Sequence, residues 1–179
     1  MQAVAPETIA RARRVDLMIF DVDGVLTDGR LWYGPQGEAL KSFHTLDGHG
    51  LKMLQSTGVR VAILSGRKSE AVAQRSRELG IEHVLQGIDD KAPAFERLLL
   101  ELALDKEAAG YMGDDVLDLP VLRRCGFACA PAEAPELVRT HAHYISQRAA
   151  GFGAVREVCE LLMHARNSLG TALARYLAD

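Results

Sequence analysis

The sequence predicts an α/β fold built on a doubly wound parallel sheet with helices on both faces. Apolar runs alternate with helical patterns along almost the whole chain of 179 residues. Several of these runs are apolar without a break, as expected of parallel strands that are covered on both faces. Repeated strand–helix–strand units with right-handed crossovers give this type of sheet. The length suits one domain with its own core, so we expect residues 1–179 to form a single domain.

Six apolar runs are predicted to be strands: Val15–Phe20, Val59–Leu64, Glu82–Gln86, Ala109–Met112, Gly126–Ala130 and Ala142–Ile145. The predicted helices are Gly48–Thr57, Ser69–Leu79, Ala92–Leu102, Val116–Arg124, Pro135–Thr140 and Ala154–Arg166. The last of these has apolar residues on one face. We expect this helix to end near Asn167–Gly170. The chain after it is expected to pack as one further turn or to fray, so that the helical C-terminal tail covers about residues 154–179.

One segment breaks the alternation directly after the first strand. Arg30–Tyr33 and Glu38–Phe43 have the pattern of two short strands, and Gly34–Gly37 between them has the composition of a turn. We therefore expect a β-hairpin over about residues 30–43, inserted into the crossover. Its aromatic side chains need a surface to cover them.

Composition excludes several classes of function. With 48% hydrophobic and 25% charged residues and a net charge of −3, the chain has no basic field for nucleic acid or anionic lipid. No apolar run approaches the ~20 residues that span a bilayer. Met1–Arg14 lacks a signal-like apolar stretch, so we expect a cytoplasmic protein. The three cysteines have no metal-type spacing and are predicted to be reduced, small apolar side chains: Cys125, Cys129 and Cys159.

Asp21 and Asp23 stand two residues apart where the first strand ends, so alternation places both carboxylates on one side of the chain. One could attack phosphorus while the other handles the proton, and Gly24 lets the backbone turn away. A polar strand end or an Asx-turn explains the pair equally well. A calcium loop does not, because Trp32 stands where that loop needs an acidic twelfth residue.

Ser65 and Lys91 stand near two predicted helix starts, where free backbone N–H groups bind anions. Ser65 alone is also explained as a simple N-cap. Lys91 is unusual, because the helix dipole disfavours a cation in the first turn. A bound phosphate would remove that penalty, and pairing with Asp90 is the competing explanation.

Gly113-Asp114-Asp115 follows the fourth strand, with Asp118 one turn later. Capping explains acidic residues at a helix start, but beside Asp21 and Asp23 they would form a cluster of mutually repelling carboxylates. A hard dication resolves that repulsion, and Mg²⁺ prefers oxygen ligands and substrate phosphate.

The absence of two nucleotide-binding motifs and the positions of four histidines limit the possible functions further. Neither G-x-x-x-x-G-K-[ST] nor G-x-G-x-x-G occurs, which argues against P-loop and dinucleotide enzymes. His141 and His143 are interpreted as exposed or core histidines rather than metal ligands. His44 and His49 lie near the hairpin and are better candidates for substrate contacts.

The chain resembles the haloacid dehalogenase superfamily of aspartate-dependent phosphatases in four ordered segments, D-x-D-G-x-x-T, S-G-R, a lone lysine and G-D-D-x-x-D. Within it, the chain is similar to the family acting on 3-deoxy-D-manno-octulosonate 8-phosphate, through L-D-G-H-G, Y-M-G-D-D-V-L-D-L-P and G-A-V-R-E-V. The similarity runs from about Val15 to Met163. It implies a three-layer Rossmann-like core without a cap domain, Mg²⁺ as cofactor, and a homotetramer in which each hairpin closes a neighbour's active site.

The resemblance also implies the role of each matched acidic residue. Asp21 would be nucleophile and metal ligand. Asp23 would be the general acid and base and would give its carbonyl oxygen to the metal. Asp114 would complete the protein ligands, with Asp115 in support.

Ser65 and Lys91 would hold the phosphoryl group, according to the same resemblance. Cationic side chains suit a substrate that carries a carboxylate as well as a phosphate. Together with Asp23 and Lys91, the expected contacts to the sugar acid are His44, Thr45, Leu46, Asp47, Gly48, Lys52, Arg67 and Arg75.

Two departures from the family pattern remove positive charge near the expected substrate. Leu46 replaces an arginine, and Ala150–Gly153, with Phe152, replaces G-G-R-G. We expect a phosphatase that forms an aspartyl-phosphate and releases 3-deoxy-D-manno-octulosonate for lipopolysaccharide synthesis. Because of these departures, a sister phosphatase for a nine-carbon keto-acid 9-phosphate stays open as an alternative. A phospho-receiver signalling domain or a non-catalytic scaffold of the same fold are further alternatives.

Overall fold

A computed structural model describes residues 4–177. Six parallel strands form one sheet in the order β5-β4-β1-β6-β7-β8. In chain order they are β1 (Leu17–Phe20), β4 (Arg60–Ser65), β5 (His83–Gln86), β6 (Ala109–Met112), β7 (Phe127–Ala130) and β8 (Tyr144–Ile145). All six predicted strands are therefore confirmed, each with its ends shifted by two residues at most.

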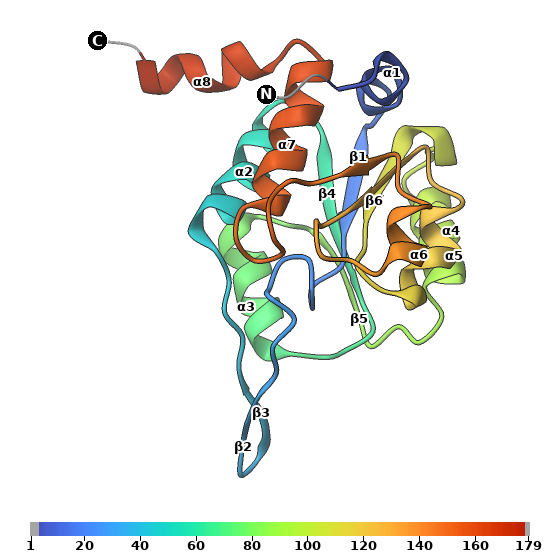
Figure 1. Cartoon of the computed structure of the whole chain (residues 1–179). Coiled ribbons are helices and arrows are strands. Elements are labelled where there is room, and N and C mark those ends of the chain that lie inside the picture. The colour runs from blue at the N-terminus through green and yellow to red at the C-terminus, as the bar shows by residue number, and fades with distance from the viewer. Residues whose placement is uncertain (1–3, 178–179) are drawn as a thin grey trace.

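Helices cover both faces of this sheet and complete the three layers (Figure 1). On one face lie α2 (Thr45–Ser56), α3 (Glu70–Leu79) and α7 (Ala154–Ala165), with α1 (Pro6–Arg13) packed against α7. On the other lie α4 (Lys91–Glu101), α5 (Leu119–Leu122) and α6 (Glu136–Arg139). Two 3₁₀ turns, η1 (Lys106–Ala108) and η2 (Val116–Asp118), and the last helix, α8 (Leu169–Leu177), complete the elements. The predicted fold class is thus confirmed.

Two helical predictions need correction, and one helix was missed. The single helix predicted over Val116–Arg124 is the 3₁₀ turn η2 followed by the short α5, because Asp118 is used in a capping box with Asp115. The tail forms the nine-residue helix α8 rather than one turn or a frayed end. Helix α1 was not predicted, although Pro6 at its start and basic residues in its last turn are typical end signals.

The N-termini of α2 and α7 are tied together by one buried carboxylate. Asp47, only 1% exposed, accepts hydrogen bonds from the backbone N–H groups of Gly153 (3.2 Å) and Arg156 (2.8 Å). It therefore caps α7 from a position 106 residues earlier in the chain. Burial of the carboxyl group raises the pKa of Asp47, against the opposing effect of these two hydrogen bonds.

The predicted hairpin is present and shorter than expected. Its strands are β2 (Trp32–Gly34) and β3 (Gly37–Leu40), which pair only with each other and project away from the main sheet (Figure 1). Trp32 is 53% exposed and Leu40 66% exposed, so in the single chain the apolar side chains of the hairpin lack a covering surface.

The prediction for the cysteines is also confirmed. The three cysteines are free and buried. Over residues 4–177, none of the helices combines the length and the apolar character that crossing a membrane requires.

Candidate active site

The predicted catalytic residues meet in one cleft of about 410 Å³ at the carboxyl ends of the central strands. Asp21 follows β1, Ser65 ends β4 and Asp114 follows β6, and β4 and β6 flank β1 in the sheet. The carboxyl ends of parallel strands share an edge, which is where ligands bind in such sheets. The alternation of elements therefore brings together residues that are up to 93 positions apart, from 21 to 114.

Lys91 lies at the centre of a buried ion-pair system. Its Nζ is 3.0 Å from Asp21 Oδ2 and 2.6 Å from Asp118 Oδ1, and its side chain is only 4% exposed. The competing explanation from sequence, pairing with Asp90, is not what the structure shows. The Asp90 carboxylate instead accepts the backbone N–H of Ala92 and caps α4.

Asp118 holds Lys91 in place and is itself fully engaged. Its Oδ1 accepts the Tyr111 hydroxyl (2.5 Å) as well as Lys91 Nζ, and its Oδ2 accepts the backbone N–H groups of Asp114 (3.0 Å) and Asp115 (3.1 Å). Sequence reasoning noted Asp118 in the motif without giving it a site role. Its spacing of one turn from the acidic pair was the available signal.

Burial and mutual repulsion shift the pKa values of the acidic groups around Lys91. Burial, opposed by Lys91 and reinforced by the charge of Asp118, raises the pKa of Asp21 to about 6. Burial and the charges of Asp21 and Asp118 raise the pKa of Asp114 to about 8. Burial alone would lower the pKa of Lys91, but the flanking carboxylates raise it instead, so its ammonium stays charged.

The donor set fits a hard cation. Carboxylate oxygens of Asp21, Asp114 and Asp118 lie within 4.8 Å of one another. Because Asp118 already accepts four hydrogen bonds, Asp21 and Asp114 are the carboxylates with capacity left for an ion. Gly24, at φ +82°, makes room for Asp114, since a β-carbon there would overlap the Asp114 carboxylate. Asp115 caps η2 by accepting from the N–H of Val116 at 2.7 Å. We refer to Asp21, Lys91, Asp114 and Asp118 as the strand-end cluster.

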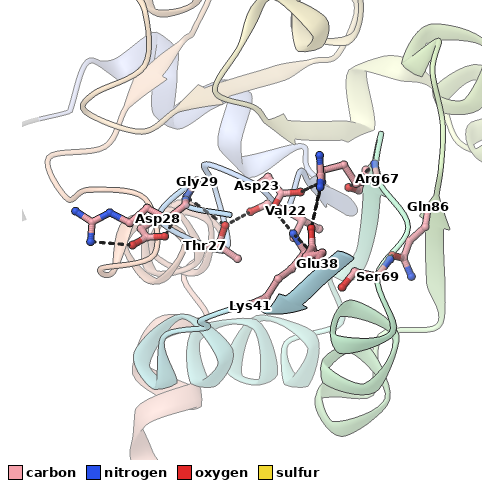
Figure 2. Close-up of polar contacts among 12 residues, drawn as sticks. Val22, Asp23, Thr27, Asp28, Gly29, Glu38, Lys41, Arg67, Ser69 and Gln86 are labelled. Carbon is pink, nitrogen blue, oxygen red and sulfur yellow. Dashed lines mark hydrogen bonds and ion pairs between the residues drawn. The ribbon is translucent and has the colours of Figure 1, made fainter. Parts of the chain in front are cut away.

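A second set of charges lies on the hairpin side of the cleft (Figure 2). Lys41 Nζ donates to Asp23 Oδ1 and lies 3.2 Å from Glu38 Oε1. Arg67 Nη2 donates to Glu38 Oε2 and to the Tyr33 hydroxyl, both at 3.0 Å. We refer to Asp23, Glu38, Lys41 and Arg67 as the hairpin cluster. Lys41 and Glu38 were not predicted, because nothing in the sequence shows that their side chains reach Asp23 and Arg67.

The residues expected to contact a sugar acid are divided between two places. Arg67 lines the cleft with Asp21 and Ser65, whose side chain is buried. Arg75 lines a separate small cavity of about 10 Å³ together with His44, Asp47 and Gly48.

The local contacts of this second group are mostly structural. His44 caps α2 by accepting from the N–H of Leu46, and the Asp47 carboxylate is committed to α7. Arg75 pairs with Glu78 at 3.2 Å. The side chains of Thr45, Leu46 and Lys52 are exposed. Their contact with substrate stays a prediction.

The remaining histidines lie away from the cleft. The ring of His49 contacts that of Tyr176 in α8, with centroids 5.4 Å apart. His143 Nδ1 accepts the backbone N–H of Ala128 in β7, and His141 Nδ1 lies 2.8 Å from the carbonyl oxygen of Leu137. These contacts agree with the structural interpretation of His141 and His143.

Comparison with known proteins identifies close relatives. The chain is 43% identical to the 3-deoxy-D-manno-octulosonate 8-phosphate phosphatase KdsC of Escherichia coli strain K12, over 94% of this chain and 90% of that protein. No protein-family model matches it.

Among solved structures, the chain is similar to phosphatases of the same kind. A probable YrbI family phosphatase from Pseudomonas syringae pv. phaseolica 1448a superposes with a TM-score of 0.96 at 47% identity, covering 98% of this chain and 99% of the other. The 3-deoxy-D-manno-octulosonate 8-phosphate phosphatase of Moraxella catarrhalis, in complex with magnesium ion, phosphate ion and KDO, superposes with a TM-score of 0.93 at 39% identity, covering 95% and 98%.

Proposed function

This chain belongs to the haloacid dehalogenase superfamily and, within it, to the family of 3-deoxy-D-manno-octulosonate 8-phosphate phosphatases, and we propose that it hydrolyses that phosphate monoester to the free sugar acid and phosphate. The observation that carries the proposal is the placement of Asp21. Its carboxylate lies in the cleft beside Lys91 and close to Asp114, with Asp23 two residues away. This set supplies a nucleophile, a cation for the phosphoryl group and a proton donor.

Mg²⁺ is the cofactor of this proposal, as in the Moraxella relative. Asp21 and Asp114, with the main-chain carbonyl of Asp23, would hold it, and a positive charge there would offset the repulsion between the grouped carboxylates. When bound, the ion neutralises charge on the phosphoryl oxygens.

In this proposal the reaction has two chemical steps, in which Asp21 and Asp23 have different roles. A carboxylate oxygen of Asp21 attacks phosphorus, and the bond from phosphorus to the sugar oxygen breaks as the Asp23 carboxyl gives its proton to that oxygen. The Asp23 carboxylate next takes a proton from a water molecule that attacks phosphorus, which releases phosphate and restores Asp21. Ser65 and Lys91 hold the phosphoryl oxygens during both steps.

The sugar-acid end is assigned to the hairpin side of the cleft, where Arg67 lies. Arg67 is the guanidinium that lines it, and a planar guanidinium binds a carboxylate through two parallel hydrogen bonds. In this proposal the product feeds lipopolysaccharide synthesis, and the cytoplasmic location stays a prediction from sequence.

The covalent step can be tested directly. During turnover of substrate labelled with ³²P, acid-quenched protein should carry label, and borohydride reduction should convert Asp21 to homoserine in the corresponding peptide. The Asp21→Asn variant should carry no label. Full turnover without any labelled protein in the wild type would overturn the covalent route.

A nine-carbon keto-acid 9-phosphate is the second candidate substrate. Leu46 and Phe152, which stand where the family has cationic residues, are 53% and 58% exposed and leave apolar surface at the N-termini of α2 and α7. Comparing kcat/KM for the eight- and nine-carbon substrates decides between the two.

We also propose that the active enzyme is a homotetramer in which each hairpin closes a neighbouring site. The exposed apolar side chains of the projecting hairpin support this, because closing an active site excludes water. Trp32→Ala should weaken the assembly in light scattering or raise KM. Unchanged mass and kinetics would contradict this part alone.

A further inference from the structure

The ammonium group of Lys41 is buried although the hairpin before it is exposed. Lys41 follows the last residue of β3, and its side chain is only 1% exposed, whereas Leu40 beside it is 66% exposed. Removing an ammonium group from water costs several kcal/mol unless carboxylates compensate it. The Lys41 ammonium group thus lies beside Asp23, a residue that lines the cleft, although the preceding hairpin is in solvent. Its burial has to be compensated by the groups that it contacts.

Those partners connect Lys41 to the proposed proton donor. Nζ donates to Asp23 Oδ1 and lies 3.2 Å from Glu38 Oε1. The other Glu38 oxygen accepts from Arg67, whose Nε is 3.9 Å from Asp23 Oδ2. Figure 2 shows the four side chains converging from three places: the segment after β1 (Asp23), the end of the hairpin (Glu38 and Lys41) and the segment after β4 (Arg67). Two carboxyl groups and two cationic side chains form a ring, which carries no net charge when Asp23 is ionised.

This ring fixes the rotation of the Asp23 carboxyl group. The position of Asp23 after β1 fixes only its backbone. Lys41 holds Oδ1, so that Oδ2 is the oxygen on the side of Arg67, a residue that lines the cleft. Asp23 itself is 19% exposed at its side chain, so without Lys41 its carboxyl group has room to rotate.

We propose that Lys41 is a positioning residue for Asp23 and that Glu38 keeps Lys41 in place. The inference rests on the proposed function, in which Asp23 gives a proton to the leaving oxygen. Proton transfer requires the two heavy atoms within hydrogen-bond reach, so a freely rotating carboxyl group slows the step without weakening substrate binding. The hairpin thereby acts on the site of its own chain, in addition to the contact proposed with a neighbour.

The competing explanation is that Lys41 only fastens the hairpin to the domain. A fastening role would change stability or assembly and would affect all substrates equally. A positioning role depends on the leaving group, because a nitrophenolate leaves without a proton whereas a sugar alkoxide requires one.

The experiment compares Lys41→Met and Lys41→Arg with Lys106→Met, a change at an exposed lysine in η1 that serves as the matched control. For the 8-phosphate sugar acid, Lys41→Met should lower kcat about 10- to 100-fold with KM changed less than about threefold. The first-turnover release of nitrophenol from 4-nitrophenyl phosphate should fall less than about threefold. Lys41→Arg should recover most of the lost kcat, and Lys106→Met should match the wild type.

Equal losses with both leaving groups, or a wild-type kcat in Lys41→Met, would overturn the inference. If Lys41→Met does not fold, Glu38→Gln provides the second test, with the same leaving-group dependence expected at smaller size and uniform behaviour contradicting it. Failure of the proposed function is recognised separately, because then the wild type does not hydrolyse the 8-phosphate. The Lys41 comparison can in that case be run on whichever alkyl phosphate the wild type does hydrolyse.

Discussion

The strand-end cluster and the hairpin cluster meet at the same cleft but are built in opposite ways. The first has three carboxylates for one ammonium group and stands on the rigid ends of β1 and β6 and the start of α4. The second balances two carboxylates with two cations and depends on a projecting hairpin. The strand-end cluster therefore has more acidic than basic groups at the candidate metal site. Repulsion among these buried carboxylates lowers the stability of the metal-free fold. A partly exposed network with balanced charges lies beside Asp23, the residue through which the proposed mechanism moves a proton.

The largest effect on stability is expected from removing the cation of the strand-end cluster. Lys91→Met leaves Asp21 and Asp118 buried without compensation, so the free energy of unfolding should fall by about 3–5 kcal/mol. Chemical denaturation of metal-free protein measures this.

The double variant Lys91→Met with Asp118→Asn provides the control for that prediction. It removes one of the two uncompensated charges, so it should be more stable than Lys91→Met alone. Equal stability of the single and double variants would show that charge imbalance is not the cause.

A smaller effect of opposite sign is expected for Asp114→Asn. The pKa of Asp114 is raised to about 8 in the folded protein, mainly by burial, against an ordinary value of 3.8. Its contribution to stability is therefore complete below pH 4 and is lost as the pH rises toward 8, because the unfolded chain ionises first. Asparagine does not titrate, so the variant should be about 1 kcal/mol more stable than the wild type at pH 7 without metal.

The pH and metal dependence of that difference tests its origin. It should shrink toward pH 4, and saturating Mg²⁺ should reduce or reverse it, because only the wild type keeps the full ligand set. Thermal melts with EDTA and with Mg²⁺ across this range measure both trends. A constant difference at every pH would contradict the charge explanation.

The smallest stability effect is expected in the hairpin cluster, from Arg67→Ala. The Arg67 side chain is 41% exposed, so losing its ion pair should change the free energy of unfolding by less than about 0.5 kcal/mol. Its loss from the cleft should raise KM for the sugar-acid phosphate about 10- to 100-fold. Arg77→Ala, which also breaks an exposed ion pair, is the control, since its KM should not change.

Much of the fold could be predicted because its signals are local. Short, largely apolar runs, several of them unbroken, identified all six strands, and Asp21, Ser65 and Asp114 could be placed together since parallel strands end at one edge. Helix ends were less predictable: α1 has ordinary end signals but is short and polar, and η2 replaces a helical turn because Asp115 and Asp118 cap each other.

The sequence by itself determined which motifs follow the ends of strands and what chemistry they carry, because those depend on residue type and on spacing along the chain. Only the tertiary structure decided that Lys91 pairs with Asp118 rather than Asp90, that Asp47 caps α7, and that Lys41 reaches Asp23. The physical reason is that such partners come from separate elements. Which polar groups satisfy one another in a low-dielectric interior is settled only once the helices and the hairpin have packed.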